Sequence, residues 1–175
     1  RADALLDALR AQDRAQAARL LATDRPDVTA RAPDGTTALH WAAHWGDAEL
    51  LERLHAAGAD ARATNDYGAT PMSEAAERGD ARMIRALLKA GADVDSPNPE
   101  GQTALMTVAR TGRVDAAQLL IKAGAKIDAR EQWRGQTALM WAAAQGQPAM
   151  VRLLVRHRAD VNARSAIRQW PRKVS

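Results

Sequence analysis

The sequence repeats itself every 33 residues. One glycine series, with spacings of 33, 33 and 34 residues, comprises Gly35, Gly68, Gly101 and Gly135. The segments that follow these glycines read TTALHWAA, ATPMSEAA, QTALMTVA and QTALMWAA. Two further series keep the same period: Gly46, Gly79, Gly112 and Gly146, and then Gly58, Gly91 and Gly124, with Arg158 in place of a fourth member. A fixed period of about 20 to 50 residues is typical of a solenoid, in which each unit packs only against its neighbours.

Each unit carries the start and stop signals of two short helices. The threonines that can cap the first helix are Thr37, Thr70, Thr103 and Thr137. The glycine near the end of each of these segments permits the left-handed turn that ends that helix. Apolar residues at spacings of three and four, such as Leu50, Leu51 and Leu54, then predict a second helix with one buried side. The turn-rich stretch that follows predicts an extended hairpin finger leading to the next unit.

These units resemble ankyrin repeats. The family consensus is close to D-x-x-G-x-T-P-L-H-x-A-A-x-x-G, followed by a leucine-rich helix and G-A-D-V-N-A. Residues 36–63, TTALHWAAHWGDAELLERLHAAGADARA, carry nearly all of this pattern. The third and fourth copies have Met106 and Met140 where the family has histidine, which is expected to weaken a hydrogen bond and keep the fold. The resemblance covers residues 2–164 and implies an all-α ankyrin-repeat solenoid of stacked helix-turn-helix units joined by hairpin fingers.

The predicted organisation is a capping unit, four repeats and a tail. Residues 1–31 form a degenerate N-terminal capping repeat, which is more polar and has no bracketing glycines. The repeats span 32–64, 65–97, 98–130 and 131–164, and residues 165–175 are a basic tail or the start of a further repeat. The last repeat cannot bury both of its sides alone. The chain is therefore expected to be a fragment of a longer array or to be closed by a lid containing Ile167 and Trp170.

Composition limits the other classes of protein. No apolar run approaches the roughly 18 to 20 residues needed to cross a bilayer, so a soluble protein without membrane insertion is expected. The absence of cysteine excludes disulfides and thiolate metal sites. The net charge of +4 is concentrated at one end, where residues 152–175 hold seven basic residues and one acidic residue. A bacterial origin is expected, with the periplasm or another exported location slightly favoured over the cytoplasm, although no residue decides between them.

The resemblance implies that a partner protein contacts the concave side, made by the first helices and the fingers. Helical spacing and finger position select twelve partner-binding candidates: Trp41, His44, Trp45, Tyr67, Glu74, Glu77, Arg78, Arg110, Trp133, Arg134, Trp141 and Gln145. Tryptophan and arginine are enriched at interface hot spots. Trp41 and Trp141 have an alternative role, filling the groove between adjacent first helices. Trp45 and Trp133 are the stronger interface candidates.

The sequence predicts a non-enzymatic protein-protein interaction module without a cofactor. The serines lack a recognisable nucleophile context, and no glycine-rich phosphate loop is present. His40 and His44 have the spacing of two metal ligands on one helix, but no third ligand accompanies them, so no metal site is expected.

Two alternative functions stay open. The basic residues near Trp170 suggest binding of nucleic acid or an acidic partner: Arg164, Arg168, Arg172 and Lys173. Nucleic acid is nevertheless the less expected partner. The uncovered last repeat suggests self-association of two chains, although a monomer is expected first.

Overall fold

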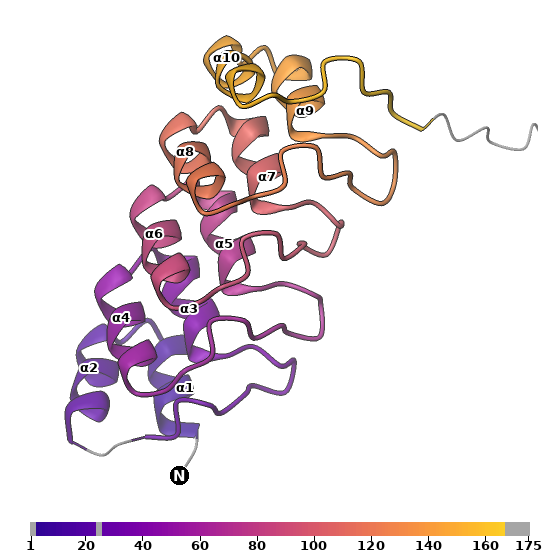
Figure 1. The fold of residues 1–175 in the computed structure, drawn as a ribbon. Helices are drawn as coiled ribbons and strands as arrows, with labels where there is room; N and C mark the ends of the chain where they lie inside the picture. The colour runs from indigo at the N-terminus through magenta and orange to yellow at the C-terminus, as the bar shows by residue number, and fades with distance from the viewer. Residues whose placement is uncertain (1–2, 24–25, 167–175) are drawn as a thin grey trace, which may run out of the picture.

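Ten helices, paired into five stacked units, make up the part of the chain that the computed structural model describes, residues 3–23 and 26–166 (Figure 1). The first helices of the units form an inner row: α1 (Asp3–Arg10), α3 (Ala38–Trp45), α5 (Pro71–Arg78), α7 (Ala104–Thr111) and α9 (Ala138–Ala144). The second helices form an outer row: α2 (Arg14–Thr23), α4 (Ala48–Ala56), α6 (Ala81–Lys89), α8 (Val114–Lys122) and α10 (Pro148–Arg156). Each helix packs against its counterpart in the next unit. The predicted all-α solenoid is confirmed.

Four fingers join the units and project on the side of the inner row (Figure 1). We number them along the described chain as finger 1 (30–37), finger 2 (63–70), finger 3 (96–103) and finger 4 (129–137). Antiparallel bridges between Arg31 and Thr37 and between Pro97 and Thr103 close fingers 1 and 3 at their bases. The arms of these fingers therefore run back on themselves, as the hairpin prediction required.

Helices α3, α5 and α7 begin after the predicted threonines and end at the predicted glycines, and α9 also begins after its threonine but is capped at its end by Gln145, one residue before Gly146. The hydroxyl oxygens of Thr70, Thr103 and Thr137 each accept a hydrogen bond from the backbone N–H three residues later. This bond satisfies one of the unpaired donors at a helix start. At the other end, Gly46 and Gly79 adopt φ values of 71° and 63°, a left-handed conformation that most side chains disfavour.

The outer helices differ in how they begin. Asp47 and Asp80 accept hydrogen bonds from backbone N–H groups in the first turns of α4 and α6. Arg113 and Gln147 stand at the same position before α8 and α10 and make no capping hydrogen bond. A missing side-chain cap leaves a helix start less stable by about 1 kcal/mol.

The first unit keeps the architecture without the glycines. Gln12 adopts a left-handed φ of 58° between α1 and α2, where the other units use glycine. Asp13 then accepts a hydrogen bond of 2.9 Å from the backbone N–H of Gln16, which caps α2. Helix α2 fully buries only Ala17, whereas α1 buries an apolar set: Leu5, Leu6, Ala8 and Leu9. The unit therefore presents an apolar side to the stack and a polar side to solvent.

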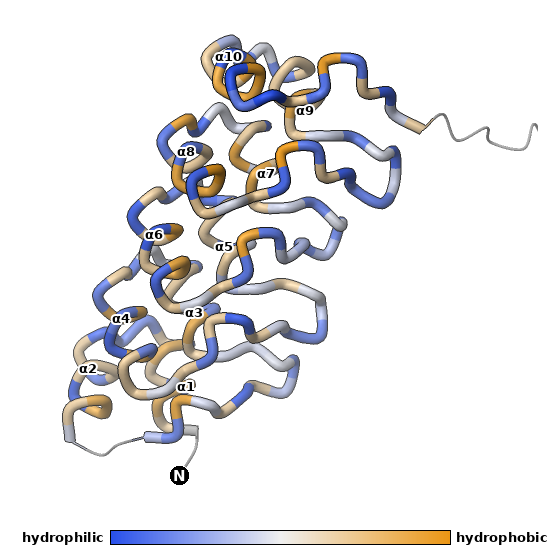
Figure 2. Tube along the Cα trace, viewed as in Figure 1, coloured by the Kyte–Doolittle hydropathy of each residue, from blue (hydrophilic) through white to orange (hydrophobic). Residues whose placement is uncertain are grey.

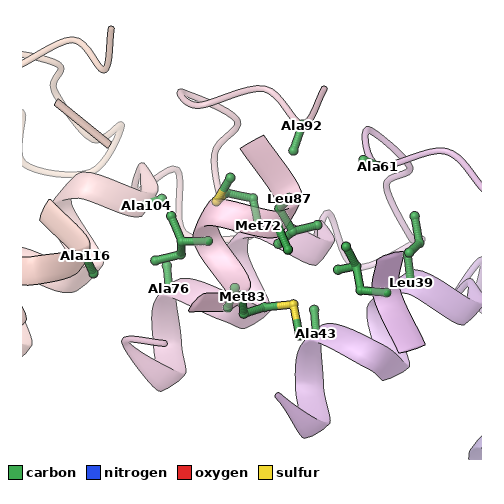
Figure 3. Close-up of a cluster of buried hydrophobic side chains, with 14 of the residues drawn as sticks. Leu39, Ala43, Ala61, Met72, Ala76, Met83, Leu87, Ala92, Ala104 and Ala116 are labelled. Atoms are coloured by element: carbon green, nitrogen blue, oxygen red, sulfur yellow. The ribbon is translucent and has the colours of Figure 1, made fainter. Parts of the chain in front are cut away.

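The core lies between the two rows of helices, and the fingers are mostly hydrophilic (Figure 2). Ala43, Ala76 and Ala109 occupy the same position in α3, α5 and α7, and all three are fully buried. Their small side chains let neighbouring inner helices approach closely. Met83 of α6 extends toward Ala43, so a long side chain fills the space beside a short one (Figure 3).

The last unit has an uncovered apolar side within the described part of the chain. Ala143 is exposed and Leu139 is half-buried, although the equivalent residues of α7 are fully buried. Val155 of α10 is 45% exposed. Ile167 and Trp170, the predicted lid, lie outside the described residues.

Candidate functional site

The fingers meet the inner helices along one corner of the stack, which we call the inner corner. The first-finger cavity, of 290 Å³, is lined by Asp34, Thr36, His40, Trp41, His44, Asn65 and Glu74. The fourth-finger cavity, of 460 Å³, is lined by Glu100, Gln102, Glu131, Trp133, Arg134, Gln136 and Trp141. Half of the twelve predicted partner-binding residues therefore line these two cavities. A wider cavity of 740 Å³ lies between the ends of α6 and α8 and fingers 2 and 3, and no predicted residue lines it.

His40 fixes the geometry of the first-finger cavity. Its Nε2 lies 3.0 Å from the carbonyl oxygen of Ala69, and its Nδ1 lies 3.2 Å from the backbone nitrogen of Thr37. Because a carbonyl only accepts and an N–H only donates, Nε2 carries the proton and Nδ1 accepts, so the ring is neutral. Burial lowers the pKa of His40 below its ordinary value of 6.5, although the bond to Ala69 and the charge of Glu74 oppose this shift.

His40 therefore links α3 to finger 2 through a hydrogen bond that methionine, as found in the third and fourth repeats, cannot make. Both ring nitrogens are already engaged, which leaves neither for a metal ion. The neighbouring His44 has a largely exposed side chain, and its Nδ1 lies 3.1 Å from Oε2 of Glu74. Across residues 3–23 and 26–166, no three or more acidic or histidine side chains gather in a way that would hold a metal.

The other repeats lack this histidine. The second copy departs from the family pattern as well as the third and fourth, because Ser73 stands where the others have Met106 and Met140. The Ser73 hydroxyl accepts from the N–H of Thr70 at 2.9 Å and donates to the carbonyl of Thr70 at 2.8 Å. It closes the first turn of α5 and uses its hydrogen bonds there. Met106 is fully buried and packs in the core.

Two tryptophans lie side by side on α3. The ring centroids of Trp41 and Trp45 are 5.7 Å apart with a 36° angle between the planes, and Trp41 meets His44 edge-on at 6.3 Å. Both tryptophans are half-buried and pack against the core. Part of Trp41 therefore fills space between helices, the alternative role foreseen for it, and part lines the first-finger cavity.

Charged residues of the inner helices connect neighbouring units. Nη2 of Arg110 on α7 lies 3.0 and 3.3 Å from the two carboxylate oxygens of Glu77 on α5. Both side chains are well exposed, so this pair contributes about 0 to 1 kcal/mol. Arg78 is exposed beside Gly46, and Gln145 is exposed at the end of α9. This part of the corner is consequently polar and close to charge-balanced.

Finger 4 accommodates the one-residue insertion with a longer side chain. In fingers 2 and 3, the amide oxygen of Asn65 or Asn98 accepts hydrogen bonds from two backbone N–H groups. Glu131 takes this place in finger 4, and it accepts from the backbone N–H groups of Trp133 (2.5 Å), Arg134 (2.7 Å) and Gln136 (2.9 Å). Burial alone would raise the pKa of Glu131, but these bonds and the charge of Arg134 lower it. The ionised carboxylate thus holds the enlarged loop closed.

The fingertips present aromatic side chains to solvent. Tyr67 at the tip of finger 2 is 68% exposed, and Trp133 at the tip of finger 4 is 63% exposed. Arg134 is exposed as well, and its carbonyl accepts a hydrogen bond from the N–H of Ala166. Trp141 of α9 is half-buried at the position that Trp41 holds in α3. Its Nε1 is buried and lacks a hydrogen-bond partner within the described residues.

The sequence did not single out all of the residues that line the cavities. Asn65 comes from finger 2, which approaches α3 only after stacking, so local patterns gave no reason to group it with Trp41. Glu131 was missed although a signal existed. The spacing of 34 residues before the last threonine marks an insertion, and a glutamate replaces asparagine just before it.

Comparison with known proteins agrees with this architecture. The sequence matches the family profile described as ankyrin repeats (3 copies) over residues 5–98 and again over residues 90–165. No curated protein matches the chain significantly. None of the helices in the described ranges combines the length and apolar character that membrane crossing requires. Since the two profile matches together span most of the sequence, the chain belongs to the ankyrin repeat family.

Proposed function

We propose that this protein binds another protein through the inner corner, the surface formed by the fingers and the exposed sides of the inner helices. Ankyrin repeats are generally protein-protein interaction modules. The proposal assigns the chain a binding role, without a reaction centre and without a cofactor. The partner-binding residues would be the twelve predicted ones, with the cavity-lining side chains among them at the centre.

The distribution of aromatic side chains carries this proposal. Tyr67 and Trp133 are exposed at fingertips, and Trp41 and Trp141 line cavities in the same corner. Large rings that combine apolar area with a polar atom dominate binding energy at many interfaces. The exposed residues of the outer helices are instead mostly charged, including Glu52, Arg85, Lys89, Lys122 and Arg156.

An affinity experiment tests the proposal. Immobilised wild-type chain is compared with a Tyr67→Ala/Trp133→Ala variant, whose two substitutions remove exposed rings and should leave the core intact. The matched control, Arg85→Ala/Lys122→Ala, changes two exposed residues of the outer helices. We expect proteins that are captured by the wild type and the control to be lost from the fingertip variant. Equal capture by all three folded proteins would refute the assignment of the inner corner.

Self-association is a second candidate function, favoured by the apolar side of the last unit. Leu139, Ala143 and Val155 are less buried than a stacked neighbour would leave them. Light scattering of the wild type and a Val155→Lys variant tests this candidate. A dimer that dissociates in the variant would support pairing, and a monomeric wild type would exclude it.

Binding of nucleic acid through the basic end is less well supported. Most of the residues that suggested it, Arg168, Trp170, Arg172 and Lys173, lie outside the described residues. The cavities of the inner corner carry carboxylates, which repel a phosphate backbone.

A further inference from the structure

We infer that the first-finger cavity receives a lysine or arginine side chain of the partner protein. This inference rests on the proposed function and specifies the chemistry of the partner. The cavity lies where finger 1, finger 2, α3 and α5 meet, so a segment crossing the first two fingers could insert one long side chain into it.

The charge of the cavity is negative. Asp34 of finger 1 and Glu74 of α5 line it, and no lysine or arginine does. A hydrogen bond from the backbone N–H of Thr36 lowers the pKa of Asp34, so this carboxylate is ionised at neutral pH. His40 is neutral, as both of its hydrogen bonds require. Two carboxylates therefore face a space that contains no permanent positive charge.

Three basic groups act on the lining of this cavity: Nδ1 of His44 lies 3.1 Å from Oε2 of Glu74, the charge of Arg10 acts on Asp34, and the charge of Arg31 acts on His40. Nη1 of Arg31 lies 3.0 Å from the carbonyl oxygen of Thr64 and is thereby held between the arms of fingers 1 and 2. Neither Arg31 nor Arg10 lines the cavity, so Asp34 and Oε1 of Glu74 stay available to a partner, whereas Oε2 of Glu74 is shared with His44.

Trp41 adds an aromatic wall. A cation near the face of a tryptophan is attracted by the ring quadrupole, and the attraction strengthens when the cation loses water. The Trp41 ring is supported by Trp45 on one side and by His44 at its edge, so its position is defined before a ligand arrives. An aromatic surface with two carboxylates is the environment that a partly desolvated ammonium or guanidinium group requires.

The first-finger cavity has room for the end of one long side chain. Its volume of 290 Å³ lies at the lower limit of pockets that hold drug-sized ligands, about 300 to 1,000 Å³. Nucleic acid is excluded as the occupant by the charge of the two carboxylates.

The site occurs once along the inner corner. The residues equivalent to Trp41 are Glu74 in α5 and Thr107 in α7, neither of which offers a ring. The fourth-finger cavity does have Trp141 and the carboxylate of Glu100, but it also has Arg134, and Glu131 already accepts three backbone hydrogen bonds. A basic residue of the partner thus fits best at the first two fingers, where two carboxylates line the cavity and no arginine does.

A nuclear magnetic resonance titration tests the inference. The probes are acetylated and amidated pentapeptides Gly-Gly-X-Gly-Gly, where X is lysine, arginine or norleucine. The signal of the Trp41 indole N–H, assigned by its loss in Trp41→Phe, is followed in the full chain labelled with ¹⁵N. We expect a saturable change in the chemical shift of this signal with the lysine and arginine peptides. The norleucine peptide should cause none, because norleucine has the hydrocarbon stem of lysine without the charge.

Charge-removing variants distinguish binding in the first-finger cavity from nonspecific attraction of a basic peptide to the protein's net charge. Glu74→Gln and Asp34→Asn should each weaken the affinity for the lysine peptide about three- to tenfold, since each substitution removes one of the two carboxylate charges and keeps the side-chain shape. Glu49→Gln makes the same change in net charge on exposed α4 and should have no effect. An equal response to norleucine, or an equal loss in Glu49→Gln, would overturn the inference.

The two proposals fail in different ways. If a captured partner is lost from Tyr67→Ala/Trp133→Ala but binds Glu74→Gln as well as wild type, the cation site is wrong and the interaction surface stands. If the fingertip variant captures the same proteins as wild type, the interaction surface is wrong, and the pentapeptide titration still decides whether the cavity binds cations.

Discussion

Replacing His40 with methionine tests whether this histidine holds finger 2 against α3. Methionine already stands at the equivalent position of the third and fourth repeats, as Met106 and Met140, so the unit tolerates its shape. The substitution removes both ring nitrogens. The carbonyl of Ala69 then loses a donor at 3.0 Å, and the N–H of Thr37 loses an acceptor at 3.2 Å.

The magnitude follows from the burial of these groups. His40 is 3% exposed and Thr37 is 6% exposed, so water replaces the lost partners poorly. A buried polar group left without a partner destabilises by about 1 to 3 kcal/mol, and an apolar replacement of similar volume limits the loss from packing. We expect His40→Met to lower the free energy of unfolding by about 2 to 3 kcal/mol. If the free energy of unfolding falls by about 2 kcal/mol per molar urea, the urea concentration at the midpoint of unfolding should fall by roughly 1 M.

The same histidine predicts a dependence on pH. The pKa of His40 is lowered in the folded protein, so the unfolded chain binds more protons as the pH falls through 6.5, the ordinary value. The stabilisation by neutral His40 is therefore complete above this pH and is lost progressively below it, down to the folded pKa. His40→Met should lack this part of the pH dependence.

Urea unfolding followed by circular dichroism at pH 8 and pH 5 measures both effects, with His55→Gln as the control on exposed α4. The control should lie within about 0.5 kcal/mol of wild type. The reasoning is refuted if His40→Met unfolds at the wild-type midpoint at pH 8. It is also refuted if the difference between the two pH values is unchanged in the variant.

Three further predictions concern the fingers and helix ends. Arg158 adopts a left-handed φ of 66°, so Arg158→Gly should relieve strain and raise the free energy of unfolding by about 0.5 to 1 kcal/mol. Gly91→Ala at the equivalent position should lower the free energy of unfolding by a similar amount. This loss comes from backbone strain alone, because nothing lies within 4 Å of the added carbon. Thermal unfolding measures both, and a less stable Arg158→Gly would contradict the strain argument. Arg113→Asp should supply the missing side-chain cap of α8 and raise the free energy of unfolding, measured in urea, by about 1 kcal/mol. The control Arg113→Ala, which supplies no cap, should give no gain. Glu131→Ala should speed hydrogen exchange at the amides of Trp133, Arg134 and Gln136 and leave those of finger 3 unchanged, and unaltered exchange would show that the carboxylate does not hold the loop.

The helices could be predicted from the sequence because their signals are local. Thr70 before α5 and Gly79 after it mark the two ends within a single segment, and the 33-residue period repeats such marks along the chain. The first unit was predicted from its register in spite of lacking glycine, and Gln12 takes the glycine conformation there. Tertiary packing overrides the local preference of a residue at such a position.

The candidate site could be predicted only in part. Trp41, His44 and Glu74 were selected by helical spacing, and they do line one cavity. Their neighbours Asp34 and Asn65 belong to different fingers, whose approach depends on the distance between stacked units. The protonation of His40 was likewise beyond local patterns, since it is set by the carbonyl of Ala69 in the following unit.

The repeats share small or apolar residues at most core positions and differ along the inner corner, and this difference gives the inner corner a direction. At one equivalent position of the inner helices, the side chain is aromatic in the second and fifth units and polar in the two units between: Trp41, Glu74, Thr107 and Trp141. The first aromatic position has Asp34 and Glu74 beside it and no arginine, whereas the last has Arg134 as well as the carboxylates of Glu100 and Glu131. The proposed partner would therefore gain more by placing its basic residue at the first cavity than by binding in the reverse direction, which would bring that residue beside Arg134. Similar core residues such as Ala43, Ala76 and Ala109 keep the units in register, and the unequal residues of the inner corner would favour one orientation of the proposed partner.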